Sequence, residues 1–481
     1  MRRLVLAFAL FALAAPGTAS AFSKTDLMIP VSDGAQIAAT YYVPDGAPPI
    51  GGWPGVILLH GLGENRNDST NAVGMSINGI AELYLVPQGY AVLTFDARGH
   101  GESGGLVSVD GPREIQDLRE LFNWLGSQPG VNARRIGAFG YSYGGGAIWR
   151  AAAEGVPFAA IEIGAAWTDL YSALGPQDLA RSGVVLGFWN SIAARAAPDV
   201  EPIVQDVLAG RNLPAVRAFA AQRSTRSLLR QIRIPTFLLQ GRRDFAFDLD
   251  QALAAYARLG GPKRLYIADF GHAPSPLPRG ELEKVLPEGR LWFDRFLKGQ
   301  PNGIDRPPLV ELAPDPWTGR IFAFTGLPAP RTLRLAFPGS ATIGARGKVT
   351  RTRPRLRRRQ ETFGPPVLKV SLASSTGWPH VVAVLSARTP RGTEIVVSAG
   401  GARVKLRPRP KRVTIRMISQ VTAVPKGSRL RLTIAATSTA QNPGNLLYLT
   451  GVPRTAQLDV GPATMTVPLL AKPVSRWLTH A

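Results

Sequence analysis

Cysteine is missing from the 481 residues of this chain. Its absence excludes disulfide bonds, thiolate metal sites and a cysteine nucleophile. Histidine is also scarce, with five residues, so few side chains are available as a base near neutral pH. Hydrophobic residues make up 45% and charged residues 19% of the chain, which permits a large core and argues against global disorder. The length predicts two or three domains.

Long apolar runs are missing after the N-terminal segment. The run LVLAFALFALAA at residues 4–15 follows two arginines and precedes ASA, a small-residue cleavage site. Residues 1–21 are therefore expected to be a signal peptide, with a secreted mature chain that starts at Phe22. An N-terminal membrane anchor is the alternative, but the run is short for a membrane span. A bacterial lipid anchor is excluded because no cysteine is present.

Strand-like and helix-like segments alternate through residues 22–304. The expected strands are residues 56–59 and the segments YAVLTF, RIGAF, FAAIEIG, PTFLLQG and RLYIADF. Residues 112–128 have apolar side chains at helical spacing, and EGRLWFDRFLKG is expected to be a closing helix. This alternation predicts an α/β fold, with a mostly parallel sheet covered on both faces. Residues 166–230, rich in Ala, Leu and Arg, are expected to form a helical lid.

The character of the sequence changes near residue 305. The segment GIDRPPLVELAPDP is a proline-rich boundary between the two regions. Beyond it, short apolar segments such as LKVSLASS, HVVAVLSA and RLRLTIAATS are separated by turn residues. This pattern predicts an all-β domain in residues 305–481, which we interpret as a two-sheet jelly roll.

A serine lies within a dense run of glycines, in GYSYG at residues 140–144. The segment fits G-x-S-x-G, and it lies between the expected strand RIGAF and the helix-compatible run GGAIWRAAA. Strand, turn and helix in this order are the context of a nucleophile elbow, with Ser142 at its tip. Gly140 and Gly144 would let neighbouring chain pass close to the strained turn. A flexible loop is the alternative interpretation.

A serine hydroxyl needs a base, and the base needs an acid to orient it. In hydrolases with this elbow the order along the chain is Ser, Asp, His. His272 follows the last expected strand and suits the base, although a structural loop histidine is the alternative. His60 and His100 precede the serine and are expected to shape loops. Asp244 ends a strand in G-x-x-D and is the favoured acid, with Asp248 in reserve.

Acyl transfer also needs N–H donors for the developing oxyanion. The backbone N–H of Tyr143 is one candidate because it follows the serine. The backbone N–H of Leu62, in HGLG after an early strand, is the other, and a plain turn is the alternative role for this loop. No P-loop lysine pattern follows the glycines, so phosphate cradling is not favoured. No cofactor and no metal site are expected.

Several segments together resemble a known family. LLHGLGENR, FDARGHGESGG, GYSYGG, LLQGRRDFAF and GHAP resemble an α/β-hydrolase. GPPVLKVSLASSTGWPHVVAVLSARTPRGTE and VPKGSRLRLTIAATSTAQNPGN resemble the C-terminal β domain of the Xaa-Pro dipeptidyl-peptidase and cocaine-esterase group. The resemblance implies a triad of Ser142, Asp244 and His272, and a jelly roll packed against the catalytic domain. Some relatives place a tyrosine hydroxyl in the oxyanion hole where this chain has HGLG.

Three hypotheses for the function follow. The first is a secreted serine hydrolase that cleaves a small ester or amide through an acyl-enzyme. In it, Trp167 and Tyr171 of AAWTDLYSAL are expected to line the acyl pocket, unless they only pack the lid. The second is a peptidase that releases dipeptides ending in proline, for which Glu162 or Asp169 would bind the free ammonium group. The third is a binding protein on an inactive hydrolase scaffold.

Positive charge is concentrated in the second region. Residues 305–481 hold 28 of the 56 basic residues but only 6 of the 33 acidic residues. The densest point is RTRPRLRRRQ, whose basic run is residues 351–359. Nucleic acid is not expected as a partner, because the run has no aromatic residues for base stacking. An anionic cell-surface polymer or acidic lipid is the candidate partner, and a solvated basic face is the alternative.

Overall fold

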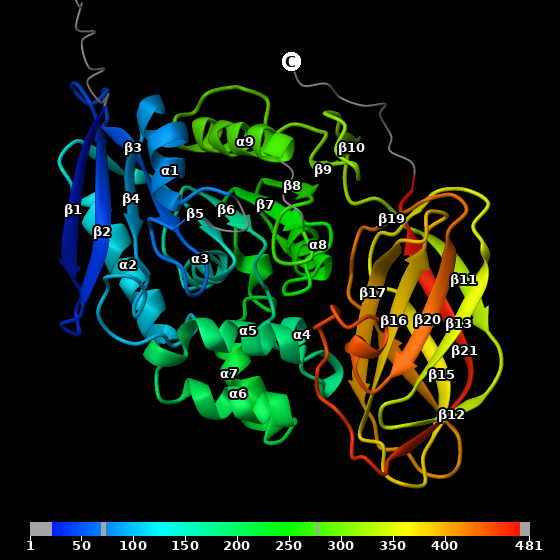
Figure 1. Ribbon diagram of the computed structural model, residues 1–481. Coiled ribbons are helices and arrows are strands. Elements are labelled where there is room, and N and C mark those ends of the chain that lie inside the picture. Colours follow the sequence, from blue (N-terminus) through cyan, green and yellow to red (C-terminus); the bar gives the residue numbers. More distant parts are fainter. Residues whose placement is uncertain (1–21, 69–73, 276–278, 472–481) are drawn as a thin grey trace, which may run out of the picture.

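The structure is a computed structural model that describes residues 22–68, 74–275 and 279–471. It has two parts that lie side by side, an α/β part and a β-rich part (Figure 1). The expected signal peptide, residues 1–21, lies outside the described residues. Among the described helices, none is long and apolar enough to cross a membrane.

A ten-stranded sheet forms the centre of the α/β part. Its order is β1-β2-β4-β3-β5-β6-β7-β8-β9-β10. The first strands are β1 (Phe22–Pro30), β2 (Gln36–Pro44), β3 (Trp53–Leu59), β4 (Ala91–Phe95) and β5 (Val131–Tyr141). The remaining strands are β6 (Ala160–Gly164), β7 (Thr236–Gly241), β8 (Lys263–Ala268), β9 (Val310–Leu312) and β10 (Phe322–Phe324). All pairs from β4 to β9 are parallel, and β3 to β8 correspond to the expected strands.

Helices cover both faces of this sheet, as expected. One apolar core lies under α2 (Pro112–Gly126), α3 (Tyr143–Ala153) and α8 (Leu249–Arg258). A second core lies under α1 (Ile77–Ile80) and α9 (Arg279–Leu297). Because the central strands are buried on both faces, they read in the sequence as continuous apolar runs.

The chain between β6 and β7 forms a helical insertion. Its helices are α4 (Leu170–Leu174), α5 (Ser182–Ile192), α6 (Val200–Ala209) and α7 (Leu213–Gln222). They lie together below the sheet in Figure 1. The insertion begins just after β6 and ends just before β7, the two strands that follow Ser142 in the chain. Its helices therefore pack over the ends of these strands.

The β-rich part consists of antiparallel sheets packed on a shared core. One sheet contains β11 (Arg331–Phe337), β12 (Ala341–Gly344), β15 (Val367–Ala373), β18 (Lys411–Arg416) and β21 (Gln457–Leu469). The other contains β13 (Lys348–Arg355), β16 (His380–Arg388), β17 (Glu394–Arg403) and β20 (Arg429–Ala435), and a short ladder joins β14 (Gln360–Glu361) to β19 (Ala423–Val424). Alternate residues of both main sheets fill the core between them, so the expected all-β fold is present.

The expected boundary at residue 305 is too early. β9 pairs with β8, and β10 pairs with β9, so both strands belong to the α/β sheet. Both are only three residues long, in a proline-rich stretch that looks like a linker in the sequence. We propose that the boundary lies between β10 and β11, where no sheet pairing joins the two parts.

The two parts meet at the helical insertion. The amide of Gln177 donates to the backbone carbonyls of Gly401 and Arg416 at 3.0 and 2.9 Å. The N–H of Leu449, from the β-rich part, donates to the Ser182 hydroxyl at the start of α5 at 2.7 Å. The β-rich part therefore holds the insertion on one side and lies next to the functional site.

Candidate active site

Ser142 stands on the sharp turn between β5 and α3. Its backbone has φ 53° and ψ −110°, a conformation that is strained for a residue with a side chain. A side chain at Gly140 would overlap the backbone of Gly144, and a Cβ at Gly144 would lie 2.5 Å from the Cβ of Leu59. The expected reason for these two glycines is therefore confirmed: they allow the close approach that the turn requires.

The imidazole of His272 lies against this serine. Its Nε2 is 2.8 Å from the Ser142 Oγ. His272 lies in the loop after β8, and the rings of Phe188 and Phe247 pack against it at 5.9 and 5.1 Å between centroids. Its side chain is 17% exposed, so the packed rings leave one side open to substrate and water.

Asp244 completes the chain of hydrogen bonds. Its Oδ2 lies 2.7 Å from Nδ1 of His272, and its Oδ1 accepts the backbone N–H groups of Ala246 and Phe247, both at 2.8 Å. The carboxylate is buried, and these donors fix its orientation. The reserve candidate, Asp248, instead caps α8 and pairs with Arg181 at 2.7 Å. Of the two acids, Asp244 is the one that contacts the histidine.

Leu62 and Tyr143, the two expected oxyanion donors, come from different elements. Leu62 lies in the loop after β3, Tyr143 is the first residue of α3, and both line a cavity with Ser142. Neither N–H donates to another residue within the described parts of the chain. Their role as oxyanion donors stays a prediction.

Glu64 holds the loop that carries Leu62, and the sequence analysis missed it. Its Oε2 accepts the N–H of Gly61 at 2.9 Å, and its own N–H donates to the Gly61 carbonyl at 3.2 Å. Burial raises the pKa of Glu64, while the Gly61 N–H and His272 lower it. The only signal in the sequence is an acid within HGLGEN, a position that a surface glutamate could equally occupy.

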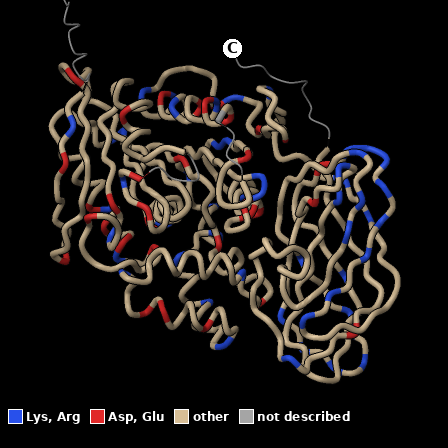
Figure 2. The backbone as a smooth tube through the Cα atoms, in the orientation of Figure 1, with Lys and Arg blue, Asp and Glu red and all other residues tan. Residues whose placement is uncertain are grey.

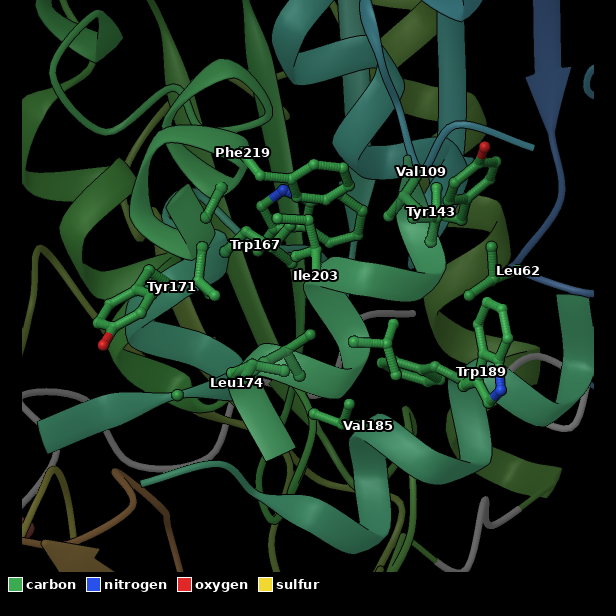
Figure 3. A pocket seen from close by; sticks show the side chains of 18 of the residues that line it. Leu62, Val109, Tyr143, Trp167, Tyr171, Leu174, Val185, Trp189, Ile203 and Phe219 are labelled. Atoms are coloured by element: carbon green, nitrogen blue, oxygen red, sulfur yellow. The ribbon is translucent and has the colours of Figure 1, made fainter. Parts of the chain in front are cut away.

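An apolar cavity of about 110 Å³ lies on one side of Ser142, and we name it the acyl chamber. Figure 3 shows its walls, which come from the helical insertion and from the loops at the strand ends. Trp167 and Tyr171, the expected pocket residues, both line it. Trp167 donates its Nε1 to the Arg223 carbonyl at 2.7 Å, and the Tyr171 hydroxyl donates to Asp178 at 2.6 Å.

The acyl chamber presents almost only carbon to a bound group. The Tyr143 and Tyr171 hydroxyls point away from it in Figure 3. Among the described residues that line it, none is Asp, Glu, Lys, Arg or His. A charged group placed in this chamber would lose its hydration without gaining a partner.

A wider cleft of about 660 Å³ opens on the other side of Ser142, and we name it the entrance cleft. Glu64 and His272 line it from the α/β part. Residues 444–447 line it from the β-rich part, and α5 separates it from the acyl chamber. The serine therefore lies between an apolar chamber and a polar, solvent-open cleft.

The two acids of the peptidase hypothesis lie elsewhere. Glu162 lines a separate small cavity against α9, on the opposite face of the sheet. Burial raises its pKa to about 8. Asp169 caps α4 by accepting the N–H of Ser172 at 3.0 Å. Neither side chain lines the acyl chamber or the entrance cleft.

The two histidines before the serine are structural, as expected. The Nε2 of His60 accepts the N–H of Ala97 at 2.9 Å, and its ring contacts His100. Burial lowers the pKa of His60 to about 4 and that of His100 to about 3. Both rings therefore stay neutral near pH 7 and brace the loops around the elbow.

The parallel sheet, the elbow after β5 and the covering helices define an α/β-hydrolase. A family model described as X-Pro dipeptidyl-peptidase (S15 family) matches residues 33–274. This match covers half of the chain, so the chain belongs to that family and is a serine-type hydrolase. The resemblance identified from the sequence is confirmed.

Curated relatives match only part of the chain. A putative Xaa-Pro dipeptidyl-peptidase of Streptomyces avermitilis is 28% identical over 299 residues, which are 55% of this chain and 42% of that protein. A cocaine esterase of a Rhodococcus species is 31% identical over 173 residues, 35% of this chain and 28% of that protein. The chain thus matches less than half of the length of these relatives.

Solved structures share the fold over nearly the whole chain. A CocE/NonD family hydrolase of Staphylococcus aureus has a TM-score of 0.71 at 15% identity, covering 93% of this chain and 94% of that one. An alpha-amino acid ester hydrolase has a TM-score of 0.64 at 13% identity, covering 95% and 98%. An α/β sheet followed by a β-rich domain is therefore the shared architecture.

Proposed function

We propose that this hydrolase cleaves esters through an acyl-enzyme formed on Ser142. His272 takes the serine proton as Ser142 attacks the substrate carbonyl, and it then protonates the leaving alcohol. Asp244 holds the imidazole in the required tautomer and stabilises its charged form. A water then enters, loses its proton to His272 and releases the acid, which restores the serine.

The developing oxyanion is bound by the N–H groups of Leu62 and Tyr143. These donors cost no reorganisation during the reaction, because the elbow and the loop after β3 already hold them. The observation that carries the proposal is the continuous hydrogen-bond chain, 2.8 Å from Ser142 to His272 and 2.7 Å from His272 to Asp244.

The acyl half of the substrate is apolar and short. A cavity of about 150 Å³ holds a benzene ring, so a chamber of about 110 Å³ takes roughly four to five carbon atoms. Each buried methylene contributes about 0.8 kcal/mol, close to a fourfold gain in kcat/KM. The alcohol or amine half then lies in the entrance cleft, next to Glu64.

Release of proline-containing dipeptides is the second candidate, and the descriptions of the family and of its Streptomyces relative favour it. The dipeptide would form the acyl half, so its free ammonium group would have to enter the acyl chamber. The described lining offers no carboxylate there, which supports the esterase over the peptidase.

The test is to measure hydrolysis of aryl acetate, butanoate and hexanoate esters beside a Gly-Pro arylamide. We expect kcat/KM to rise from acetate to butanoate and to rise no further at hexanoate, and we expect the arylamide to react at least a hundredfold more slowly than the butanoate. Faster cleavage of the arylamide than of every ester would overturn the esterase proposal in favour of the peptidase.

A fluorophosphonate probe distinguishes an enzyme from a binding protein on a hydrolase scaffold. The probe should label the wild type and Ser275→Ala, whose serine lines the same cleft, but not Ser142→Ala. Ser142→Ala should fold normally and lose roughly 10³-fold or more in kcat. Labelling of Ser142→Ala at the wild-type level would place the nucleophile elsewhere.

Export is proposed on the sequence of residues 1–21, which has the charge, apolar run and cleavage site of a signal peptide. We expect the mature protein to begin at Phe22. N-terminal sequencing of the protein from the medium or periplasm of its host would check this, and an intact Met1 would contradict it.

A further inference from the structure

Three arginines lie side by side across neighbouring strands of the β-rich part. Arg355 of β13 is the register partner of Arg429 of β20, and Arg429 is in turn the partner of Arg388 of β16. Register partners in antiparallel strands point to the same face of a sheet, and all three residues are exposed. We call Arg355, Arg429 and Arg388 the arginine row.

Like charges directly opposite each other destabilise a sheet. Within the described parts of the chain, no member of the row forms an ion pair or a side-chain hydrogen bond. The neighbouring Arg431 shows the usual solution, since it pairs with Glu394 at 2.8 Å. The row forms no ion pair of its own: Glu394, the register partner of Arg388 on β17, instead pairs with Arg431 and accepts the Ser386 hydroxyl. An external anion would therefore lower a repulsion that this one neighbouring carboxylate offsets only in part.

The row lies within a larger basic surface. Arg357, Arg358, Arg391 and Lys426 are exposed and lie in the turns next to the ends of these strands. Figure 2 shows Lys and Arg spread over the β-rich part with few acidic residues among them. From residue 331 onward the acidic residues are Glu361, Glu394 and Asp459.

Not every arginine of the run at residues 351–359 belongs to this surface. Arg351 points across the sandwich and donates to the carbonyls of Gly461 and Val460 at 2.8 and 3.0 Å. Arg359 donates to the Asp315 carbonyl at 2.8 Å and so reaches the α/β part. These arginines hold the fold together, and neutralising the whole run would test stability as well as binding.

We propose that the arginine row binds a linear polymer that carries repeated phosphate groups. Adjacent strands lie about 4.8 Å apart, so the row presents three guanidinium groups along a line of about 10 Å. A guanidinium binds two oxygens of a phosphate at once, which suits this spacing of charges to a chain of phosphates. The polymer would hold the enzyme near its ester substrate.

A lipid surface fits this face less well than a polymer. Among the described residues, the large apolar side chains that are strongly exposed are Met28, Ile50, Leu83, Leu106, Leu186 and Leu446. Only Leu446 belongs to the β-rich part, and it lines the entrance cleft rather than the row. Membrane-surface proteins combine basic charge with inserted apolar groups, which this face lacks.

The arginine row lies where a bound polymer would leave the candidate active site accessible. The same face of β16 packs against the insertion at Val382 and Val384, and Arg388 lies farther along the strand, beyond that contact. A polymer on the row would therefore bind beside the domain contact. Binding of polymer and hydrolysis of ester should proceed independently.

The test measures retention of the full-length protein on immobilised long-chain polyphosphate between 0.05 and 0.5 M salt. Arg355→Gln/Arg388→Gln/Arg429→Gln should weaken binding at least tenfold and lower the slope of log K against log salt by about 2, at roughly 0.7 per lost contact. The control is Arg409→Gln/Lys411→Gln/Arg412→Gln, three exposed charges in and just before β18 of the other sheet, and it should change binding less than threefold.

Other outcomes would overturn the proposal. Equal weakening by the two triple variants would show that net charge alone drives retention. Tighter binding to vesicles of acidic phospholipid, or to double-stranded DNA, than to polyphosphate would give the surface a different ligand. Ester hydrolysis of both variants should match the wild type, and the row variant should unfold at the wild-type temperature or slightly above it, because a like-charge repulsion is removed. Arg355→Lys/Arg388→Lys/Arg429→Lys should restore part of the binding if the row itself is the site.

Discussion

The α/β part and the β-rich part use arginine in different ways. Up to residue 304 the chain has almost as many acidic as basic residues, whereas residues 305–481 hold 28 basic and 6 acidic residues. In the α/β part, buried Arg98 pairs with Asp117 at 2.7 Å, and buried Arg264 pairs with Glu311 at 2.8 Å. In the β-rich part, the arginine row forms no ion pair among the described residues, and the carboxylate opposite Arg388, that of Glu394, pairs with Arg431 instead.

The paired, buried arginines and the exposed arginine row serve different purposes. A buried arginine with its carboxylate is an internal brace, and removing either partner leaves an unpaired charge in the core. An exposed row of like charges does not stabilise the fold, and we propose that it acts on an outside partner. We therefore assign chemistry to the α/β part and attachment to the β-rich part, and each of the following variants tests one side of this division.

The largest expected loss of activity should come from replacing Asp244, the proposed catalytic acid of the α/β part. Asp244→Asn should lower kcat by about 10³–10⁴-fold, because the amide favours the wrong imidazole tautomer. Asp248→Asn should lower kcat less than tenfold, although it should lower the melting temperature by weakening the buried pair with Arg181. Both variants should keep wild-type retention on polyphosphate. Steady-state kinetics that give the reverse order would mean that Asp248 is the acid.

The pH dependence of stability should also originate in the α/β part. Burial raises the pKa of Glu162 from 4.5 to about 8, so the folded protein holds this proton more tightly than the unfolded chain does. The protonated Glu162 carboxyl therefore makes its whole contribution to the free energy of unfolding below pH ~4.5. This contribution is lost as the pH rises toward ~8. Glu162→Gln should be more stable than the wild type by roughly 2–5 kcal/mol at pH 9, with no difference at pH 4.

Denaturant unfolding at the two pH values measures this effect. Glu201→Gln, an exposed glutamate on α6, is the control and should show no pH-dependent difference. A Glu162→Gln protein that is less stable than the wild type at pH 9 would show that the ionised carboxylate stabilises the fold instead.

A smaller effect should come from filling the acyl chamber. Ile203 of α6 lines the chamber, so Ile203→Trp should lower kcat/KM for a butanoate ester about tenfold, the equivalent of about two methylenes. Activity on an acetate ester should stay within twofold. Leu208→Trp, on the same helix but outside the lining, should leave both unchanged. An equal loss on both esters would mean that the chamber does not hold the acyl group.

The smallest effect should come from the charge beside the histidine. Glu64→Gln keeps an acceptor for the Gly61 N–H but removes a negative charge from the cleft that Glu64 and His272 both line. Steady-state kinetics should give a kcat two- to fivefold lower than that of the wild type. Glu64→Ala should lower kcat further, because the loop that carries Leu62 loses this hydrogen bond. An unchanged kcat in both variants would leave Glu64 without a role.

Motifs with local meaning could be read from the sequence. The elbow at Ser142, the strand ends at Asp244 and His272, and the alternation of elements each depend on a few neighbouring residues, and the structure has them where expected. The antiparallel strands β1 and β2 were not foreseen. β1 is mostly exposed, so its sequence lacks the apolar run of a buried strand, and β2 is mostly buried but is recognisable as its partner only in the sheet.

Features that depend on residues far apart in the sequence could not be predicted from the sequence. β9 and β10 are recognisable only by their pairing with β8, so the boundary was set too early. Arg351 and Arg355 look alike in the run, but strand register sends the first to backbone carbonyls and the second to solvent. The row with Arg388 and Arg429 joins three strands that are far apart in sequence.

One column experiment tests most directly whether the α/β part carries the chemistry and the β-rich part the attachment. It measures hydrolysis of an aryl butanoate by protein held on polyphosphate resin. Wild type should be retained and active, Ser142→Ala retained and inactive, and Arg355→Gln/Arg388→Gln/Arg429→Gln active but found in the flow-through. Retention of this triple variant at the wild-type level, or loss of retention by Ser142→Ala, would contradict the separation of chemistry and attachment.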